Sequence, residues 1–536
     1  MDGSCNECKS IEYLKYDNLK LNIKNTFTKE LPADVLKDNT RRQVENAAFS
    51  YVLPKKTAKP AVVHVSQEMA SELNISEEET QSEFFKNIVT GNEIYPNTTP
   101  FAMCYAGHQF GNWAGQLGDG RAINLFEVAH QNKNWKVQLK GAGETPYSRT
   151  ADGLAVLRSS VREYLCSEAM FHLGVPTTRA LSLSLSGDSV LRDILYDGHP
   201  DYEKGAIVSR VSPSFLRFGS FEVFTARNDL KNLKVLTDYT IKNHFPHLGK
   251  PSKENYIAFF KEVTTRTLEM IIHWQRVGFV HGVMNTDNMS ILGLTIDFGP
   301  YGWLEGFDFG WTPNTTDNQH KRYRYGNQPN MGLWNLYQLA NALYPIIEEV
   351  EPLEAILNQY TIDFEKQSLA MMRSKLGFIT EEADDAALLQ NLEDNLQLVE
   401  IDMTIFFRSL NNFKEDTSGL KLIEKAFYDF ENISDAVINS WNLWFTKYKD
   451  RLQKETISSE ERKEKMDAIN PKYVLRNYMS QMAIDEADKG NYTLIDTLFQ
   501  LLKTPYAEQP ENEKWFAKRP EWARNKVGCS MLSCSS

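Results

Sequence analysis

The stretch from His281 to Gly299 limits the possible folds of this chain more than any other, because an amide and two carboxylates flank a short apolar run. We predict a hairpin whose strand, residues 292–296, holds Asn288 and Asp297 facing each other. Hard cations such as Mg²⁺ take oxygen ligands of this kind, and enzymes that use nucleotide phosphates take further metal ligands from the phosphates. The alternative is that both are turn residues, because Asn, Asp and Gly are common in turns for backbone reasons alone.

The composition is that of a globular protein of enzyme size. Of the 536 residues, 42% are hydrophobic and 24% are charged, which is enough core for two or three domains. The formal net charge of −12 offers no basic surface to nucleic acid or to an anionic membrane, so we predict neither partner. No apolar run approaches the roughly 18 residues that span a bilayer. The N-terminal residues show neither a signal core nor an Arg-rich transit pattern, which favours a cytoplasmic location.

Residues 105–121 form a glycine-rich segment that is suited to bind an anion. Its glycines let backbone N–H groups converge without obstruction by Cβ atoms. Gly115, Gly118 and Gly120 follow the order G-x-x-G-x-G, which differs from the G-x-G-x-x-G of kinases and dinucleotide-binding folds. Turns also use glycine freely, so the segment alone is a weak signal. Arg121 at its exit strengthens it, because a guanidinium is a charged fork for a phosphate.

A lysine and a glutamate follow this segment at positions that suit an ion pair. We predict strands at 122–128 and 135–140, and the alternation in the second places Lys140 on the face opposite the core. A helix predicted at 154–173 carries Glu163, whose neighbours one turn away are Ser and Cys and cannot neutralise it. In kinases such a strand lysine and helix glutamate form the ion pair that positions the lysine on nucleotide phosphates.

Arg210 and Arg217 lie in an otherwise apolar and small-residue setting. Buried arginines need anions, and a bound phosphate would serve. A structural salt bridge to an acidic neighbour is an equally good interpretation.

The rest of the chain is predicted to be mainly helical, with no repeat and no low-complexity linker. Residues 255–277 have the apolar spacing of a helix that leads to His281. Further helices are predicted at 334–347, 353–367, 386–407, 433–452 and 492–502, and their apolar stripes are most simply core.

The six cysteines cluster toward the ends of the chain and are expected to be reduced thiols. Cys5 and Cys8 could join Cys529 and Cys534 in a four-thiolate zinc site only if the termini met. The C-x4-C spacing of the second pair is loose for such a site, which argues against it.

In combination these residues resemble the SelO (selenoprotein O) family of protein-kinase-like adenylyltransferases. The family-like strings cover roughly residues 95–480 and lie at 105–111, 116–121, 139–143, 145–149, 282–289 and 470–477. The resemblance implies an α+β, kinase-like two-lobed fold with an N-terminal extension at 1–94, an N-lobe at 95–225, a C-lobe at 226–345 and a helical C-terminal region at 346–536. It also implies AMP transfer from ATP to Ser, Thr or Tyr hydroxyls of proteins, with ATP bound so that its α-phosphate faces the acceptor.

The resemblance assigns roles to particular positions. ATP would be bound by Gly118, Gly120, Arg121 and Lys140, with Glu163 orienting the lysine and with Asp152 and Gly153 in the same pocket. Arg210 and Arg217 would bind the phosphates. Asn288 and Asp297 would hold Mg²⁺, and Asp287 would act as the base. Mn²⁺ is an alternative metal. The expected partners are ATP and hydroxyl-bearing proteins, and the expected state is a monomer.

Position 283 separates this chain from ordinary kinases. A kinase places its catalytic Asp five residues before the metal-binding Asn, and the corresponding residue here is Val283. Ordinary γ-phosphoryl transfer is therefore disfavoured, and Asp287 is the nearest carboxylate that could replace the base or help to hold the metal. A conventional phosphotransferase and an inactive ATP-binding scaffold are the alternatives. Retention of Asp287, Asn288 and Asp297 argues against a scaffold.

The last three residues, Cys534-Ser-Ser, occupy the place of the selenocysteine-Ser-Ser found in some family members. A redox role for Cys534 and an inert tail are equally compatible with this. Family members in eukaryotes are mitochondrial, but this N-terminus lacks a transit pattern.

Overall fold

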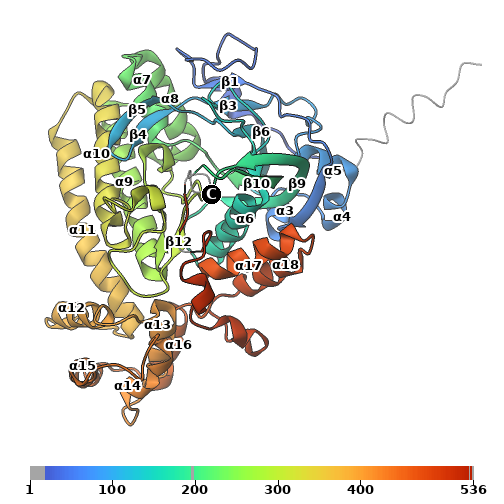
Figure 1. Ribbon diagram of the computed structural model, residues 1–536. Helices are drawn as coiled ribbons and strands as arrows, with labels where there is room; N and C mark the ends of the chain where they lie inside the picture. Colours follow the sequence, from blue (N-terminus) through green and yellow to red (C-terminus); the bar gives the residue numbers. More distant parts are fainter. Residues whose placement is uncertain (1–18, 195–197, 530, 534–536) are drawn as a thin grey trace, which may run out of the picture.

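An antiparallel sheet of eight strands organises the first part of the chain. The structure is a computed structural model that describes residues 19–194, 198–529 and 531–533. Figure 1 shows the sheet on the right and a mostly helical part on the left and below. The strands lie in the order β1 (Phe49–Tyr51), β3 (Phe101–Met103), β6 (Ala122–His130), β7 (Lys133–Lys140), β10 (Asp201–Ser212), β9 (Arg179–Arg192) and β2 (Ala61–Val65), and β8 (Ala155–Val156) pairs with β10. This arrangement agrees with the predicted α+β class.

Strands β6 and β7 form a hairpin that is longer than predicted. Its two-residue turn, Gln131 and Asn132, has positive φ at both positions, which matches the twist of the flanking strands. The alternation in β7 is confirmed, but both of its faces are buried. The polar face is stabilised by specific partners, as in the 2.8 Å ion pair between Lys136 and Glu127. Lys140 is therefore not a solvated lysine.

The residues before the glycine-rich segment supply both edges of the sheet. Strand β1 begins the strand order and β2 ends it, and the helices α2 (Thr26–Glu30), α3 (Gln67–Glu72), α4 (Glu77–Thr80) and α5 (Glu83–Val89) accompany them. Helix α2 is fixed to β6 because Glu127 accepts the backbone N–H groups of Thr26 and Phe27 at 3.0 and 2.9 Å. Residues 49–51 and 61–65 of the predicted N-terminal extension are therefore part of the sheet.

His244, at the end of α8 (Leu230–His244), makes the stability of this region depend on pH. Its Nε2 is buried and has no hydrogen-bond partner in the part of the chain that the structure describes, and burial, with Lys136 nearby, lowers its pKa from 6.5 to about 3. Below pH 6.5 the unfolded chain binds a proton that the folded chain does not, so stability falls as the pH falls. Between pH 7 and pH 5 we expect a loss of about 2 kcal/mol from this group.

Urea unfolding at pH 7 and pH 5 measures this loss. His244→Phe keeps a ring beside Tyr239, which it meets edge-on at 6.0 Å, and removes the titrating group. The variant should lose about 2 kcal/mol less than the wild type between the two pH values. Equal losses in both proteins would show that His244 does not carry the effect.

Helix α6 (Leu157–His172) packs on the sheet, against β9 and β10, and carries Glu163. It begins later than predicted because residues 155–156 form β8. Helices α17 (Asn477–Asp488) and α18 (Thr493–Leu502), from the far end of the chain, pack against α6 in turn, and Figure 1 shows them beneath it.

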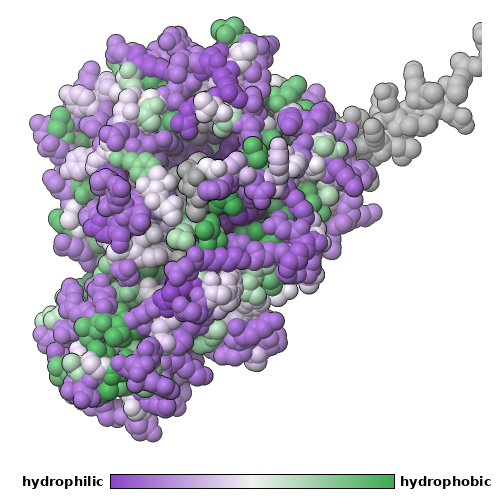
Figure 2. Space-filling view, viewed as in Figure 1, coloured by the Kyte–Doolittle hydropathy of each residue, from purple (hydrophilic) through white to green (hydrophobic). Residues whose placement is uncertain are grey.

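The helical part is built around α9 (Lys253–Val277), which confirms the helix predicted at 255–277. Around it lie α7 (Phe218–Ala226), α8, α10 (Gln328–Ile347) and α11 (Glu351–Leu376). Helices α10 and α11 are longer than predicted. Among the described residues, no helix is long and apolar enough to cross a membrane. Figure 2 shows a largely hydrophilic face with a hollow near its centre.

A second hydrophobic cluster lies at the end of α11, below the rest of the molecule in Figure 1. It is formed with α12 (Asp385–Leu396), α13 (Met403–Leu410), α14 (Gly419–Leu422), α15 (Asp435–Leu452) and α16 (Ser459–Asp467). The helices predicted at 433–452 and 492–502 are confirmed by α15 and α18, with starts shifted by up to two residues. The single helix predicted at 386–407 is wrong. Asp402 divides it, because its carboxylate caps α13 at Ile405 N and pairs with the buried Arg476 at 2.6 Å.

The strand predicted at 292–296 is also wrong. These residues are nearly all buried, and only Thr295 makes an isolated bridge, to Thr177. Gly293 has a φ of +66° and its Cα lies against the backbone of Arg266, where a Cβ atom would clash. A two-stranded ribbon of β11 (Phe279–Val280) and β12 (Gly302–Trp303) brackets the stretch instead. It brings the two ends of the stretch together, as the predicted hairpin would have done.

Candidate active site

A cavity of about 680 Å³ lies between the sheet and the helical part. Eleven of the twelve residues singled out from the sequence line it: Gly118, Gly120, Arg121, Lys140, Asp152, Gly153, Arg210, Arg217, Asp287, Asn288 and Asp297. The twelfth, Glu163, contacts Lys140 from behind the wall. The structure therefore brings all of these positions together, although they are spread over 180 residues of sequence.

The predicted ion pair between Lys140 and Glu163 is present, with Nζ and Oε2 2.5 Å apart and both side chains buried. Burial, opposed by Glu163 and aided by Arg121 and Arg210, lowers the pKa of Lys140 to about 8. The ammonium group is thus charged near neutral pH. It is directed into the cavity, where an anion can bind it.

Both predicted arginines reach Asp297. Arg210 donates to Oδ1 at 2.6 Å and to Glu163 at 3.3 Å, and Arg217 donates to Oδ2. Burial alone would raise the pKa of Asp297, but Arg217, Arg210 and Lys140 hold it well below its usual range. Asp297 also has a φ of +56°, an uncommon conformation for a residue other than glycine. The salt-bridge interpretation of the arginines is thus correct, and their partner is the candidate metal ligand.

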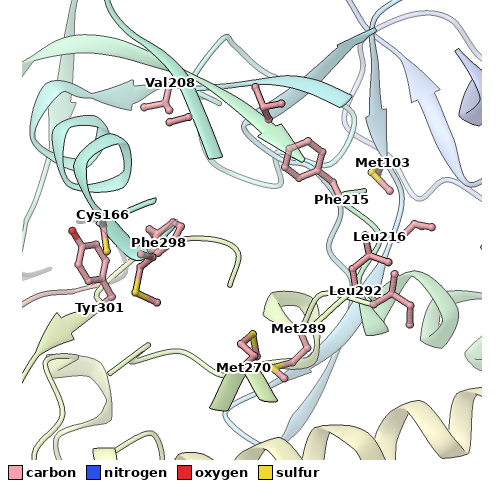
Figure 3. Close-up of a cluster of buried hydrophobic side chains, with 14 of the residues drawn as sticks. Met103, Cys166, Val208, Phe215, Leu216, Met270, Met289, Leu292, Phe298 and Tyr301 are labelled. Carbon is pink, nitrogen blue, oxygen red and sulfur yellow. The ribbon is translucent and has the colours of Figure 1, made fainter. Parts of the chain in front are cut away.

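The residues after Asp297 attach it to α6. Tyr301 Oη donates to the carbonyl of Arg162 at 2.8 Å, and Arg162 donates back to the carbonyl of Tyr301 at 2.6 Å. Figure 3 shows Phe298 and Tyr301 beside Cys166 of α6 in the buried cluster. Arg162 precedes Glu163, so one helix positions both the lysine's partner and the Asp297 loop.

Asp287 and Asn288 lie on a 3₁₀ turn, Thr286–Asn288, at the base of the cavity. Asn288 donates its side-chain N–H to the carbonyl of Val283 at 3.0 Å, so its amide oxygen points away from that carbonyl. Asp287 is buried, and its Oδ1 has no hydrogen-bond partner among the described residues. Burial raises its pKa to about 6, although Arg217 acts in the opposite direction. A carboxylate with a free oxygen and a pKa near 6 is suited to accept a proton at neutral pH.

The hairpin of β4 (Ala106–Gln109) and β5 (Asn112–Gln116) holds this turn in place. Neither the hairpin nor its contact with the turn is predicted from the sequence. Gln109 donates to Oδ2 of Asp287 at 3.2 Å, and the backbone N–H of His108 donates to Thr286 at 2.8 Å. A Cβ atom added at Gly107 would lie 2.8 Å from Oγ1 of Thr286, so only glycine allows this approach. The glycine-rich segment therefore contacts the turn at 286–288 as well as lining the cavity.

Asp119 was also missed, although it lies between Gly118 and Gly120. It is buried in the cavity wall, and its Oδ2 accepts the amides of Asn124 and Gln138 at 3.1 and 3.2 Å. Gln138 in turn accepts from Arg210, and Arg217 lies 3.9 Å from Oδ1 of Asp119. Asp119 thus connects to both arginines. The sequence signal for Asp119 is its place inside a glycine loop. A carboxylate there would repel a bound phosphate unless cations surrounded it, so its presence indicates nearby cations.

The glycine positions are fixed by close contacts. Gly118 has a φ of +87°, and a Cβ atom there would lie 2.4 Å from the ring of Tyr147. Gly153 has a φ of +68°, with a Cβ position 2.1 Å from the carbonyl oxygen of Gly143. Asp152 forms a two-pronged pair with Arg192, both bonds at 2.8 Å, at the cavity mouth. Its carboxylate is therefore already paired.

The side-chain oxygens of Asn288, Asp287 and Asp297 suit a hard cation whose remaining ligands come from phosphate and water. No group of three or more His, Cys, Asp or Glu side chains in the described ranges could enclose a metal. Asn288 and Asp297 provide an amide and a carboxylate oxygen on the same cavity wall, beside the free oxygen of Asp287. Two protein ligands completed by phosphate oxygens and water are typical of Mg²⁺ in nucleotide-using enzymes.

The described cysteines, Cys104, Cys166 and Cys529, are free and buried. Burial raises the pKa of each thiol, so none is a reactive thiolate. Cys5, Cys8 and Cys534 lie outside the described residues, and with them the zinc site and the redox tail.

A cavity lined by three buried cations, an amide beside a carboxylate, and a second carboxylate with a free oxygen is suited to nucleotide-dependent group transfer. Comparison with known proteins narrows this class. The family model described as protein adenylyltransferase SelO matches residues 36–503. A protein nucleotidyltransferase YdiU of Flavobacterium johnsoniae is 63% identical over 522 residues, 97% of this chain and 100% of the relative. Namesakes from Rhodopirellula baltica and Aromatoleum aromaticum are 51% and 50% identical, each over 96% of this chain and 99% of the relative. This chain belongs to the SelO family of protein adenylyltransferases, and it is a nucleotidyltransferase.

Proposed function

We propose that this protein transfers AMP from ATP to Ser, Thr or Tyr hydroxyls of other proteins and releases pyrophosphate. The observation that carries the proposal is the convergence of Lys140, Arg210 and Arg217 on the cavity that holds Asp287, while Val283 stands at the position of the kinase base. Three buried cations suit a reaction in which charge builds up over a whole triphosphate. Membership of the family supports the same reaction.

In the proposed mechanism, Lys140, Arg210 and Arg217 bind the triphosphate, with Gly118, Gly120 and Arg121 at the same wall. Oδ1 of Asp287 takes the proton of the acceptor hydroxyl, whose oxygen attacks the α-phosphorus. The bond from the α-phosphorus to the bridging oxygen breaks, and pyrophosphate leaves with that electron pair. Asn288 and Asp297 would hold Mg²⁺, or Mn²⁺ in its place, which supplies charge neutralisation on the phosphates.

The proposal extends to the architecture and the setting of the enzyme. We assign a kinase-like two-lobed arrangement with α6 and the sheet strands β3 and β6 to β10 as N-lobe (95–225), the α9 region as C-lobe (226–345), an N-terminal extension (1–94) that adds β1 and β2 to the sheet, and a helical C-terminal region (346–536). The position of the Lys140–Glu163 pair on sheet and helix supports it. We also propose a monomer in the cytoplasm that acts on proteins and not on nucleic acid, in accord with the net charge of −12.

A comparison of two labelled nucleotides tests the reaction. The protein is incubated with Mg²⁺ and a generic acceptor protein, once with ATP labelled at the α-phosphate and once at the γ-phosphate. We expect α-label alone on protein. Transfer of the γ-label would mean a conventional phosphotransferase with a different base, and transfer of neither label to any protein would favour the ATP-binding scaffold.

Gln109 is expected to act as a positioning residue in this reaction. Gln109→Ala removes the donor that holds Oδ2 of Asp287 and so lets the carboxylate rotate. We expect kcat to fall roughly tenfold, the scale of one lost hydrogen bond to a charged group, with KM for ATP nearly unchanged. Gln109→Asn, whose side chain is shorter, tests the geometry. If the loss appears in KM for ATP instead, Gln109 serves the nucleotide and not the base.

A further inference from the structure

The segment between Asp308 and Glu348 has an unusual charge balance for this acidic chain. Its only carboxylate is Asp317, whereas Lys321, Arg322 and Arg324 follow within eight residues. Lys321 is exposed, and the two arginines are partly exposed. Within the described ranges, no carboxylate oxygen lies within 4.0 Å of the charged groups of these three side chains, a set that we call the basic triad.

Asp317 forms no ion pair within 4.0 Å with the basic triad, because both of its oxygens accept backbone N–H groups. Oδ1 accepts the backbone N–H of Arg322 at 2.9 Å, and Oδ2 accepts that of Tyr323 at 2.7 Å. Arg324 donates one N–H to the carbonyl of Lys321 at 3.0 Å, which fixes its direction without balancing its charge. The loop is therefore held in shape, with Lys321 exposed and Arg322 and Arg324 partly exposed.

The segment that carries the basic triad is joined to the residues around the turn at 286–288 by short contacts. Tyr323 Oη donates to Oδ1 of Asn285 at 2.5 Å and accepts the backbone N–H of Phe110 at 3.0 Å. A Cβ atom added at Gly111, at the tip of the β4–β5 hairpin, would lie 3.3 Å from the guanidinium of Arg322. The same guanidinium lies 4.6 Å from the ring centre of Trp334 on α10. Arg322 is thus placed against the hairpin whose Gln109 holds Asp287.

These contacts allow the distance between Arg322 and the Asp287 carboxylate to be estimated. Gln109 and Gly111 are two residues apart, so Arg322 lies within roughly 10 to 15 Å of the Asp287 carboxylate. An extended peptide advances about 3.3 Å per residue. A side chain about three to five positions from the acceptor residue would therefore meet the basic triad.

We propose that Lys321, Arg322 and Arg324 form a docking surface for acidic segments of acceptor proteins, with Asp or Glu about three to five residues from the modified hydroxyl. The inference rests on the proposed AMP transfer and names the class of acceptor for that same site. Unpaired cations beside an active site attract carboxylates and speed their association. ATP is served by other cations, because the cavity that contains Lys140, Arg210 and Arg217 is not lined by the basic triad.

Three synthetic peptides test the proposal with the full-length protein and α-labelled ATP. Each has one serine, flanked about three to five positions away on both sides by glutamate, glutamine or lysine. We expect KM to be roughly tenfold lower for the glutamate peptide than for the glutamine peptide, and highest for the lysine peptide. The preference should shrink as salt is raised from about 0.05 to about 0.5 M, because exposed charges are screened. Equal KM values for the glutamate and glutamine peptides would overturn the proposal.

Charge reversal identifies the residues. The double variant Lys321→Glu with Arg324→Glu should invert the order of the peptides and leave KM for ATP unchanged. Lys447→Glu is the matched control, since Lys447 is exposed on α15, far from the cavity, and has no ion pair among the described residues. If the double variant instead raises KM for ATP with every peptide, the basic triad serves the nucleotide. Lys321→Gln with Arg324→Gln repeats the test should the charge reversal lower the melting temperature.

The readout also separates this inference from the proposed function. If no α-label reaches any peptide or the enzyme itself, AMP transfer is refuted, but docking is still measurable by fluorescence anisotropy of the labelled glutamate peptide. Tight binding that the double variant weakens roughly tenfold supports the surface. Equal binding of the glutamate and glutamine peptides refutes it.

Discussion

Replacement of Asp297 by Ala is expected to lower AMP transfer at least about 10²-fold, the usual scale for losing one group that stabilises charge in the transition state. The carboxylate is the candidate metal ligand that both arginines contact, and they hold its pKa well below its usual range, so it is ionised near neutral pH. The loss should fall on kcat. ATP binding in the absence of divalent metal should be retained, because Arg210 and Arg217 lose a competing anion and remain free for phosphates.

Two further variants serve as controls for Asp297→Ala. Asp297→Asn retains the size of the side chain, which separates loss of charge from a cavity between the arginines. Asp308→Ala removes an exposed carboxylate from the same segment and should leave activity unchanged. A purified, folded Asp297→Ala protein with activity like the wild type would remove Asp297 from the metal site.

Replacement of Asp287 by Asn should reduce kcat by about 10²- to 10⁴-fold, the contribution of a positioned general base. Asn has nearly the same shape and still accepts the hydrogen bond from Gln109, but it cannot take a proton from the acceptor. KM for ATP should change little, because the triphosphate contacts belong to other side chains. The measurement is steady-state kinetics with ATP and acceptor varied in turn.

The same variant decides between the two roles that the sequence leaves open for Asp287. If the residue acts as base, the Mg²⁺ concentration for half-maximal rate stays the same in Asp287→Asn. If it helps to hold the metal, that concentration rises and high Mg²⁺ restores much of the rate. Glu222→Gln is a suitable control, because Glu222 is a buried carboxylate that contacts the same hairpin through His108 at 2.7 Å and does not line the cavity.

The candidate site was predictable because its residues have few local partners. Glu163 had no possible partner one turn away on its helix, and Arg210 and Arg217 stood in apolar surroundings, so charge balance required contacts across the fold. The structure supplies them at Lys140 and Asp297. Gln109 and Asp119 were missed because an amide needs no counter-ion, and because the cations around Asp119 come from a strand and a helix start about 90 to 100 residues later.

The errors in the fold have a related origin. Residues 386–407 carry a continuous apolar stripe, and no glycine or proline interrupts it. The break at Asp402 depends on Arg476, 74 residues away, which sequence periodicity cannot detect. The apolar run at 292–296 has the composition of a buried strand, and such short runs have no periodicity that would distinguish a strand from other buried structure. Strand β7 shows the opposite case, where the alternation was right but its polar face turned out to be buried.

The attachment of the Asp297 loop to α6 also limits how this enzyme can be switched off. Arg162 and Tyr301 exchange hydrogen bonds at 2.6 and 2.8 Å, and α17 and α18 brace the helix on another side. An outward swing of α6 that separated Glu163 from Lys140 would break these buried bonds and disturb the two C-terminal helices together. The helix therefore fixes the positions of Glu163 and of the Asp297 loop relative to each other. We therefore expect control of this enzyme to act on access of nucleotide and acceptor to the cavity rather than on the position of α6.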